Sequence, residues 1–322
     1  MMTNVKDVPK QRILGTSGLQ VSAVSIGTVE LGLDYGIQIP GQAGRPTETD
    51  AIRLLQESAD KGVNLFDTAP NYGEAERIVG RALGHRRDTI ITTKIHQPCK
   101  EDGQFIHGEQ LQGLVEQSLC RSMQNLKRDV LDVVQIHNAT VEILNDGGLL
   151  QALVKAKEKG LLRFIGCSVY QVNEALAGIH TGVLDVLQVA YNILDQRMAE
   201  RVFPLAQDAG VGIMVRSVLL KGVLTEKAKW LPSSLSSLRQ AVDSIKTQLN
   251  LSWDSLPQTA LRFCLSHPQV ATVLIGIQTQ EELQAALQAV DLGGLDPEEL
   301  EQAQALGLTD QDLLNPSTWA LP

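Results

Sequence analysis

Four polar residues lie at or near the C-terminal ends of apolar runs, and together they could move a proton. Asp67 lies near the end of VNLFDTA, Lys94 near the end of TIITTKI, and His137 ends LDVVQIH, while Tyr72 follows Asp67 in DTAPNYGEAE. A buried strand would open into a loop at each of these points. Because the C-terminal ends of strands in a parallel α/β barrel share one face, we expect the four side chains to form one site.

The four residue types suit the protonation of a carbonyl oxygen. Tyrosine is a weak acid with an ordinary pKa near ~10, and a lysine ammonium beside it lowers that pKa. A carboxylate behind the lysine would keep the lysine charged and oriented. We therefore assign Tyr72 as the general acid, Lys94 as the group that tunes it, Asp67 as the orienting carboxylate and His137 as the ligand of the substrate oxygen.

Each of these residues also has an ordinary structural interpretation. Asp67 could cap the following helix, Tyr72 could be a surface aromatic, Lys94 could be a solvated amine, and His137 could be a hydrogen-bonded structural histidine. Such roles give no reason for the four residues to fall at the ends of successive strands. Their coincidence favours the catalytic interpretation.

Eight short apolar runs, rich in valine and isoleucine, predict the strands that position these residues. Runs that are apolar on both faces are typical of buried parallel strands. Segments of helical period lie between them, for example 50–61, 109–126 and 279–290, so we predict a (β/α)₈ barrel. The alternative, a doubly wound sheet, usually carries a G-x-G-x-x-G turn after its first strand, and none occurs here. The eight runs are 21–27, 63–69, 89–95, 131–137, 163–169, 185–191, 211–217 and 270–276.

Three further features extend this barrel prediction. Residues 11–20 contain a glycine-centred turn and are expected to form a hairpin that closes the barrel bottom. Residues 218–269 are too long for one crossover, so we expect an inserted loop or short helix before a helix at 234–249. Thr279 and Glu282 have the spacing of a capping box. With no linker or low-complexity tract, residues 1–322 are predicted to form a single domain.

Composition excludes several classes of function. The net charge is −9 and no block of Lys and Arg occurs, which argues against a nucleic-acid surface. No apolar run approaches the roughly 18 residues of a membrane span, and the first residues do not resemble a signal peptide. The four widely spaced cysteines fit reduced thiols in a cytoplasmic protein. Three of them, Cys120, Cys167 and Cys264, adjoin apolar periodic segments and are expected to be buried.

Nearly the whole chain resembles the aldo-keto reductase superfamily. The segments that carry the resemblance are ILGTSGLQVSAVSIGTVELG, GVNLFDTAPNYGEAERIVGRAL, TTKI, LKRDVLDVVQIH, and GLLRFIGCSVY followed by DVLQVAYN. The resemblance implies a (β/α)₈ barrel that binds a nicotinamide dinucleotide without a Rossmann fold and needs no metal. It implies hydride transfer between that cofactor and a carbonyl, with Tyr72 giving the proton and Lys94, Asp67 and His137 in the roles above.

The resemblance also implies a set of cofactor contacts. Ser168 and Gln188 match the residues that hold the carboxamide, and Asp67 lies near the nicotinamide ribose. Positions in the loops after the first, seventh and eighth barrel strands complete the set, namely Gly27, Thr28, Arg216, Ser217, Leu219, Lys221, Gly222, Gly276, Gln278, Thr279 and Glu282.

Some of these positions depart from the family pattern. Val169 replaces the asparagine that usually holds the carboxamide, and Arg216 stands where many members have a ring stacked on the nicotinamide. A planar guanidinium can also stack; alternatively, Arg216 pairs with a local carboxylate. No Lys or Arg occurs from 272 to 322, where many members grip the 2′-phosphate of NADP. NADPH and NADH are therefore equally expected, and Lys221 or Lys227 could reach that phosphate instead.

The expected partner is a small carbonyl or sugar substrate. The polar loop LGLDYGIQIPGQAGRPT suits a hydroxylated molecule, and an aromatic content of 4% argues against a pocket for large apolar carbonyls. The spacing of GTVELGLDYGI, SVY and NILDQR resembles a bacterial branch of the family found with sugar metabolism. Two alternatives stay open at this point: a Schiff-base lyase with Lys94 as nucleophile, and a redox-sensing or regulatory subunit that binds cofactor without turnover.

Overall fold

The computed structural model describes residues 10–41 and 44–319, and within these residues eight parallel strands form a closed barrel. The strand order around the barrel is β10-β3-β4-β5-β6-β7-β8-β9. The predicted (β/α)₈ barrel is therefore confirmed, and the doubly wound alternative is wrong. The barrel strands are β3 (Val24–Gly27), β4 (Leu65–Asp67), β5 (Ile90–Ile95), β6 (Leu131–Ile136), β7 (Leu162–Val169), β8 (Val186–Ala190), β9 (Gly212–Arg216) and β10 (Val270–Gly276).

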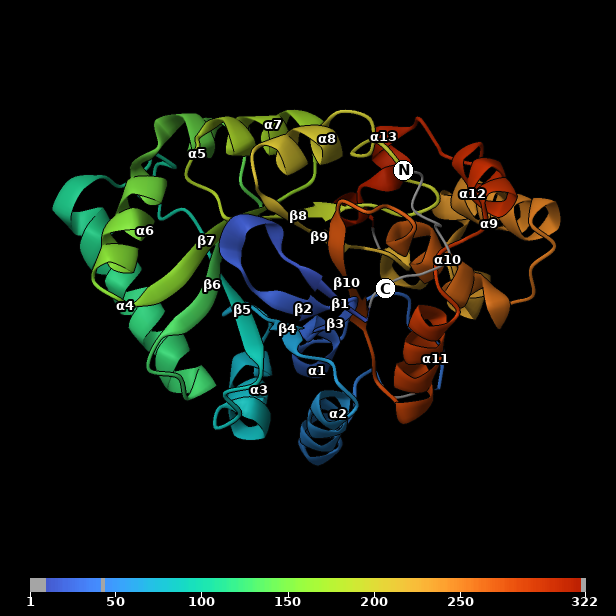
Figure 1. Ribbon diagram of the computed structural model, residues 1–322, viewed down its shortest axis with the longest axis horizontal. Coiled ribbons are helices and arrows are strands. Elements are labelled where there is room, and N and C mark those ends of the chain that lie inside the picture. Colours follow the sequence, from blue (N-terminus) through green and yellow to red (C-terminus); the bar gives the residue numbers. More distant parts are fainter. Residues whose placement is uncertain (1–9, 42–43, 320–322) are drawn as a thin grey trace.

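Helices surround the barrel strands on the outside, as Figure 1 shows. Their apolar faces pack on the strands because the helical period places the apolar residues on one side. The helices are α1 (Val29–Gly32), α2 (Glu48–Asp60), α3 (Ala75–Leu83), α4 (Gly108–Leu126), α5 (Val141–Asp146), α6 (Gly148–Glu158), α7 (Val172–His180), α8 (Val202–Asp208), α9 (Ser236–Gln248), α10 (Ser255–Leu265), α11 (Gln280–Asp291), α12 (Pro297–Gln304) and α13 (Gln311–Leu314).

The predicted hairpin exists and closes one end of the barrel. β1 (Gln11–Ile13) and β2 (Gln20–Ser22) pair antiparallel, and in Figure 1 the dark blue hairpin lies across the centre of the barrel. Burying a leucine side chain contributes roughly 1.5–3 kcal/mol, so this plug stabilises the end of the barrel opposite the C-terminal ends of the strands. The hairpin side chains Leu14, Leu19 and Val21 pack in one buried cluster with Leu65, Ile90, Val133, Val186 and Met214 of the strands.

The first predicted strand, 21–27, is too long in the sequence interpretation. Only Val24–Gly27 belongs to the barrel, because Val21 and Ser22 belong to strand β2 of the hairpin and pair with β1. Ser22 marks the change: its amide donates to Asn64 Oδ1 at 2.7 Å, and its hydroxyl donates to the carbonyl of Val24 at 2.7 Å. The apolar pattern runs unbroken across this junction, so it could not reveal the change of partner.

The long segment 218–269 contains the predicted insertion. It includes the 3₁₀ turns η2 (Leu220–Gly222), η3 (Glu226–Trp230) and η4 (Ser233–Leu235) before α9, which confirms the helix expected at 234–249 within two residues at its start. A further 3₁₀ turn, η5 (Pro316–Thr318), follows α13. None of the described helices is long and apolar enough to cross a membrane.

The cysteine prediction holds at two of its three positions. Cys167 and Cys264 are buried, and burial raises the pKa of both thiols above its ordinary range. Cys120 is exposed, which corrects the expectation of burial. It lies on α4, where the buried stripe runs through Val115, Leu119 and Ser122 instead.

Candidate active site

A buried ion pair between Lys94 and Asp67 forms the base of the candidate site. Asp67 is the last residue of β4, Lys94 lies near the end of β5, and the two strands are neighbours in the barrel. Lys94 Nζ lies 2.5 Å from Asp67 Oδ2 and also donates to the carbonyl of Thr68 at 2.9 Å. The residues are 2% and 4% exposed. Burial alone would lower the pKa of Lys94, but Asp67 and Tyr72 outweigh it, so this pKa lies above its ordinary value.

The second oxygen of Asp67 accepts three more hydrogen bonds. Thr92 Oγ1 donates to Oδ1 at 2.5 Å, and the side-chain amides of Gln135 and Gln188 donate at 3.0 Å each. A buried carboxylate needs such partners because desolvation otherwise favours its neutral form. These bonds hold the Asp67 carboxylate in a fixed position behind Lys94. Gln135 was missed in the sequence; the available signal was a polar amide inside the apolar run of β6.

Tyr72 lies beside the ion pair, on the loop between β4 and α3. Lys94 Nζ is 5.0 Å from the centroid of the Tyr72 ring. The amide of Tyr72 donates to the carbonyl of Ala69 at 3.1 Å, which forms a turn just after the strand. Gly32 packs against this turn so closely that a Cβ at Gly32 would lie 1.8 Å from the carbonyl oxygen of Tyr72. The chain therefore needs glycine at 32 to seat Tyr72.

His137 completes the predicted group of four. Its ring lies edge-on to Tyr72, with centroids 5.8 Å apart, and is 4.5 Å from the ring of His96. Burial, together with the charge of Lys94, lowers the pKa of His137 to about 2. The imidazole is therefore neutral at physiological pH. Its Nδ1 is buried with no hydrogen-bond partner among the described residues, and this leaves an unsatisfied polar atom at the site.

The four residues adjoin a cavity of about 700 Å³, which lies within the range of small-molecule sites. Asp67, Tyr72 and His137 line the cavity, and Lys94 lies behind them. Most of the predicted cofactor positions line it as well, namely Gly27, Thr28, Ser168, Gln188, Arg216, Ser217, Leu219, Lys221, Gly222, Gly276 and Glu282. Gln278 and Thr279 are not among the residues that line the cavity.

The loop after β9 forms a strained wall of this cavity. Ser217, Leu220 and Lys221 have φ values of 59°, 47° and 55°, and Gly222 has 97°. Left-handed conformations in non-glycine residues cost of order 1–3 kcal/mol each and concentrate at ligand-binding loops. Backbone turns of this kind direct successive N–H groups into concavities that bind anions.

The predicted carboxamide ligands are engaged with protein groups in this structure. Ser168 Oγ accepts from the amide of Asn138 at 3.0 Å, and Gln188 holds Asp67. At Val169 only the backbone contributes a polar contact: its carbonyl accepts from Arg216 Nη2 at 2.9 Å. Arg216 Nη1 donates to Ser217 Oγ at 3.2 Å, and no carboxylate pairs with Arg216 in the described part of the chain. This overturns the alternative in which Arg216 forms a local ion pair.

At the other end of the cavity, the start of α11 differs from the predicted capping box. Thr279 Oγ1 accepts from the amide of Glu282 at 3.3 Å, as expected, but Glu282 Oε2 accepts from the amide of Gln278 at 2.6 Å. In a capping box the Glu282 side chain would bond the amide of the N-cap, Thr279. Here it bonds the amide of Gln278, the residue before the N-cap. The side-chain amide of Gln278 donates to the carbonyl of Gly44 at 2.9 Å and joins two loops.

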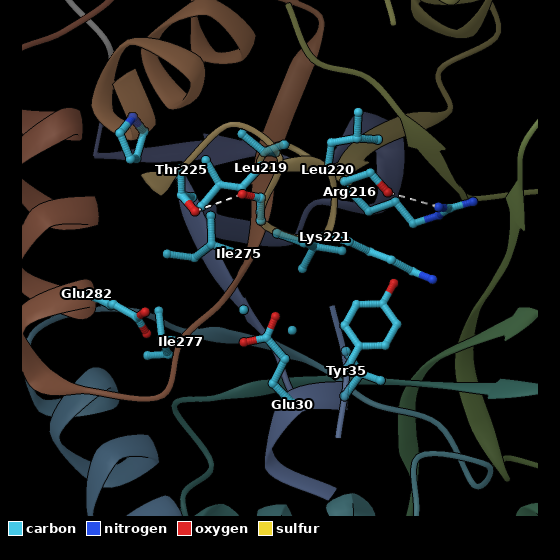
Figure 2. A pocket seen from close by; sticks show the side chains of 18 of the residues that line it. Glu30, Tyr35, Arg216, Leu219, Leu220, Lys221, Thr225, Ile275, Ile277 and Glu282 are labelled. Atoms are coloured by element: carbon cyan, nitrogen blue, oxygen red, sulfur yellow. Dashed lines mark hydrogen bonds between the residues drawn. The ribbon is translucent and has the colours of Figure 1, made fainter. Parts of the chain in front are cut away.

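Glu30 brings a further carboxylate into the cavity. Burial raises the pKa of Glu30 to about 7, Lys227 opposes that shift, and Glu282 adds to it. The Glu30 carboxylate lies against the backbone of Gly276, where a Cβ would meet it at 2.5 Å. Figure 2 shows this carboxylate in the space between Tyr35 and Glu282. The polar lining at this end is thus mainly acidic.

Several lining residues were missed in the sequence. They include Glu30, Tyr35, Asn138, Tyr170, Trp230 and Trp253, whereas Lys227, named in the sequence as a possible phosphate contact, does line the cavity. Tyr35 belongs to the loop LGLDYGIQIPGQAGRPT, which was singled out for its polar character and not for this residue, and Glu30 lies just before that loop, in α1. The others lie in loops or, for Trp230, at the end of η3, and their positions depend on tertiary contacts.

Comparisons with known proteins agree with this geometry. Residues 23–307 match the model of the aldo/keto reductase family. The chain is similar to the holo structure of an aldo-keto reductase from Bacillus halodurans, with 30% identity, a TM-score of 0.77, and coverage of 94% of this chain and 97% of that one. It is 28% identical to L-galactose dehydrogenase of Arabidopsis thaliana, over 92% of this chain and 93% of that protein. It is also 28% identical to NADH-specific methylglyoxal reductase of Escherichia coli (strain K12), over 66% and 68%.

Proposed function

Because the chain belongs to the aldo/keto reductase family, we propose that it is an NAD(P)H-dependent oxidoreductase that transfers hydride between nicotinamide and a carbonyl. The carbonyl belongs to an aldehyde, ketone or sugar, and Tyr72 acts as the general acid. One observation carries the proposal: Tyr72 lies at the wall of a 700 Å³ cavity with Lys94 Nζ 5.0 Å from its ring.

Two features support the fit of a nicotinamide dinucleotide to this cavity. The strained loop from Ser217 to Gly222 offers a backbone concavity suited to a pyrophosphate. The buried Nδ1 of His137 lacks a partner among the described residues, which suits a site that receives a polar ligand. A dinucleotide bound there supplies the hydride, and the residues below supply binding, orientation and the proton.

The roles of the four residues follow from their charges. The Lys94 ammonium stabilises the phenolate that forms when Tyr72 gives its proton to the carbonyl oxygen. Asp67, held by four donors, keeps that ammonium in place. Neutral His137 holds the same oxygen by a hydrogen bond and does not itself supply a proton. In the reverse direction, Tyr72 accepts the proton of the alcohol.

The nature of the nucleotide depends on the acidic end of the cavity. Glu30, Glu281 and Glu282 line that end, and among the described lining residues there Lys227 is the cation near Glu30. A 2′-phosphate would meet carboxylates there, whereas a free ribose hydroxyl can donate to them. We propose that NADH is accepted at least nearly as well as NADPH. The relative named NADH-specific methylglyoxal reductase is in keeping with this proposal.

A second candidate function is a subunit that binds cofactor without turnover. The same cavity supports this candidate, because cofactor binding requires the residues that line the cavity and does not require Tyr72 as a proton donor. The complete group of Asp67, Tyr72, Lys94 and His137 favours turnover. A Schiff-base lyase is disfavoured because Lys94 is a charged ammonium bonded to Asp67 and Thr68.

The test is oxidation of NADH and of NADPH, followed by absorbance at 340 nm, with simple aldehydes, methylglyoxal and aldoses as substrates. Wild type should turn over at least one of these carbonyls. Cofactor binding, measured separately by protein fluorescence, separates the two candidates. Tight binding with no turnover on any carbonyl would support the regulatory subunit and reject the enzyme.

A further inference from the structure

Three cationic side chains that line the cavity form no ion pair with a described Asp or Glu within 4.0 Å. One of them, Lys227, acts on the nearby Glu30 carboxyl and opposes the rise in its pKa. The other two are Arg216, at the end of β9, and Lys221, in η2, and they line the same cavity as Tyr72 and His137. Burial removes part of the hydration of a cation, and without a nearby anion the resulting free-energy cost is not fully offset. This arrangement is therefore suited to receive an anionic ligand.

Arg216 is held rigidly in place by its surroundings. Its guanidinium carbon lies 4.0 Å from the centroid of the Tyr170 ring. Nη2 donates to the carbonyl of Val169 and Nη1 to Ser217 Oγ. A guanidinium carries five N–H donors in a planar fork, and these two bonds leave others for a ligand. A pre-oriented fork is well matched to a carboxylate or a phosphate.

The charge of Arg216 reaches the chemical centre. Its cation contributes to the lowered pKa of His137, after burial, Lys94 and His96. It also acts on Tyr35, whose pKa burial raises above its ordinary value with a further contribution from Tyr170, while Arg216 opposes that shift. Arg216 thus lies close enough to Tyr35 and His137 to influence both.

Lys221 approaches the same region from the neighbouring loop. Its Nζ lies 5.1 Å from the centroid of the Tyr35 ring and donates to the carbonyl of Pro316 at 2.7 Å. The backbone carbonyl of Lys221 accepts from the amide of Ile37 at 3.1 Å, which ties the Tyr35 loop to this one. Figure 2 shows Tyr35 below the side chains of Lys221 and Arg216. Tyr35 therefore lies next to both cations.

We propose that Arg216, assisted by Lys221, binds an anionic group on the carbonyl substrate. The substrate class is then a small aldehyde or ketone that carries a carboxylate or a phosphate monoester a few bonds from its carbonyl. In Figure 2 Lys221 and Arg216 lie above Tyr35, and the Glu30 carboxylate lies on the other side, toward Glu282, so charge also orients the substrate in the cavity. This proposal rests on the carbonyl reduction proposed above, and it reassigns Arg216 and Lys221 from cofactor to substrate.

Two matched pairs of substrates test the proposal. The first pair is 4-oxobutanoate and its methyl ester, and the second is glycolaldehyde phosphate and glycolaldehyde. The two members of each pair carry the same aldehyde and differ in whether they carry a negatively charged group. For wild type we expect kcat/KM at least tenfold higher for the anionic member of one pair, and that pair identifies carboxylate or phosphate. Equal values within both pairs would overturn the proposal.

The variant Arg216→Met separates substrate binding from cofactor binding. It should remove the preference for the anionic member of the pair, mainly through a higher KM for that member. The dissociation constants of NADH and NADPH, measured by fluorescence, should stay within threefold of wild type. Equal losses for both members of a pair, or weakened cofactor binding, would show that Arg216 serves the cofactor and would overturn the proposal. Lys221→Met should give a smaller loss in the same direction.

Arg53→Met is the matched control, because Arg53 lies exposed on α2 and should alter neither ratio. If Arg216→Met does not fold, inhibition of wild type decides instead. Succinate should compete with the carbonyl substrate and succinamide should not; equal inhibition by the two would reject the anionic subsite. Absence of any carbonyl reduction, with cofactor bound, would refute the proposed function itself. In that case binding of succinate over succinamide to the cofactor complex still tests the subsite.

Discussion

Lys94 Nζ and Asp67 Oδ2 lie 2.5 Å apart at the ends of neighbouring strands, and both side chains are almost fully buried. Burial makes the two charges mutually dependent. Each charge is costly to bury alone, and each is stabilised by the other. The pair therefore has a structural role beneath Tyr72 as well as a chemical one.

Replacing Lys94 by methionine should destabilise the fold strongly. The substitution leaves Asp67 buried with Thr92, Gln135 and Gln188 as donors but without a cation, and removal of one partner of a buried pair costs about 3–5 kcal/mol. Urea unfolding of the two proteins measures this difference. Lys10→Met is the control, because Lys10 pairs with Asp291 on the surface, where such pairs contribute about 0–1 kcal/mol. Equal losses in the two variants would contradict the account.

His137 should stay neutral throughout the working pH range. Burial and the charge of Lys94 lower its pKa to about 2, so protonation begins far below neutrality. The pH profile of kcat/KM should lack a step from His137 between pH 5 and 8. His96, whose pKa burial and Lys94 also lower, is the control, and His137→Gln and His96→Gln are compared with wild type. A step near pH 6.5 that disappears only in His137→Gln would refute a neutral imidazole.

Glu30 should make the cofactor-free protein less stable as the pH rises. Its pKa is raised from 4.5 to about 7, chiefly by burial. Below pH 4.5 the carboxyl is protonated in both folded and unfolded states, so it contributes no difference. Between pH 4.5 and 7 the unfolded chain ionises first, and stability falls, on the order of 3 kcal/mol in all.

The measurement for Glu30 is the urea midpoint of wild type and Glu30→Gln at pH 4.5, 6 and 7.5. The gap between them should widen with pH in favour of Glu30→Gln, because glutamine cannot ionise. Glu301→Gln, at an exposed position of α12, should show no such change. A constant gap across the three pH values would mean that Glu30 ionises normally in the fold.

The preference for NADPH over NADH should be weaker than tenfold. A tenfold ratio corresponds to about 1.4 kcal/mol of cofactor discrimination, and the acidic lining near Glu30 and Glu282 offers a 2′-phosphate no net attraction. Fluorescence titration with both cofactors gives the ratio of dissociation constants. Glu30→Gln should shift that ratio toward NADPH. A wild-type ratio above tenfold in favour of NADPH would overturn this view of the acidic end.

The barrel and the grouping of Asp67, Tyr72, Lys94 and His137 at one end of it could be predicted because strongly local signals mark them. Apolar runs rich in β-branched residues identified the strands, and the strand ends then placed Asp67, Lys94 and His137 on one face. Gln135 and Gln188 show a finer signal: each is an amide inside a buried strand, and both donate to Asp67. An interior polar residue needs a partner, so the two glutamines could have been linked to that carboxylate.

The cavity walls could not be predicted to the same degree. Tyr35 reaches its place because the amide of Ile37, in the same loop, donates to the carbonyl of Lys221, 184 positions further along the chain. Val169 and Arg216 were recognised as departures from the family, but their contact with each other was not. Such contacts depend on the three-dimensional paths of loops that are distant in sequence, and local sequence periodicity does not encode these paths.

The variant Tyr72→Phe tests the central claim most directly. It removes one hydroxyl and leaves the ring that lies beside Lys94 and His137. Loss of a general acid typically costs 10²–10⁴-fold in rate, so carbonyl reduction should fall by at least about 100-fold. The dissociation constants of NADH and NADPH should stay within threefold of wild type. Turnover equal to that of wild type would contradict the assignment of Tyr72 as the proton donor.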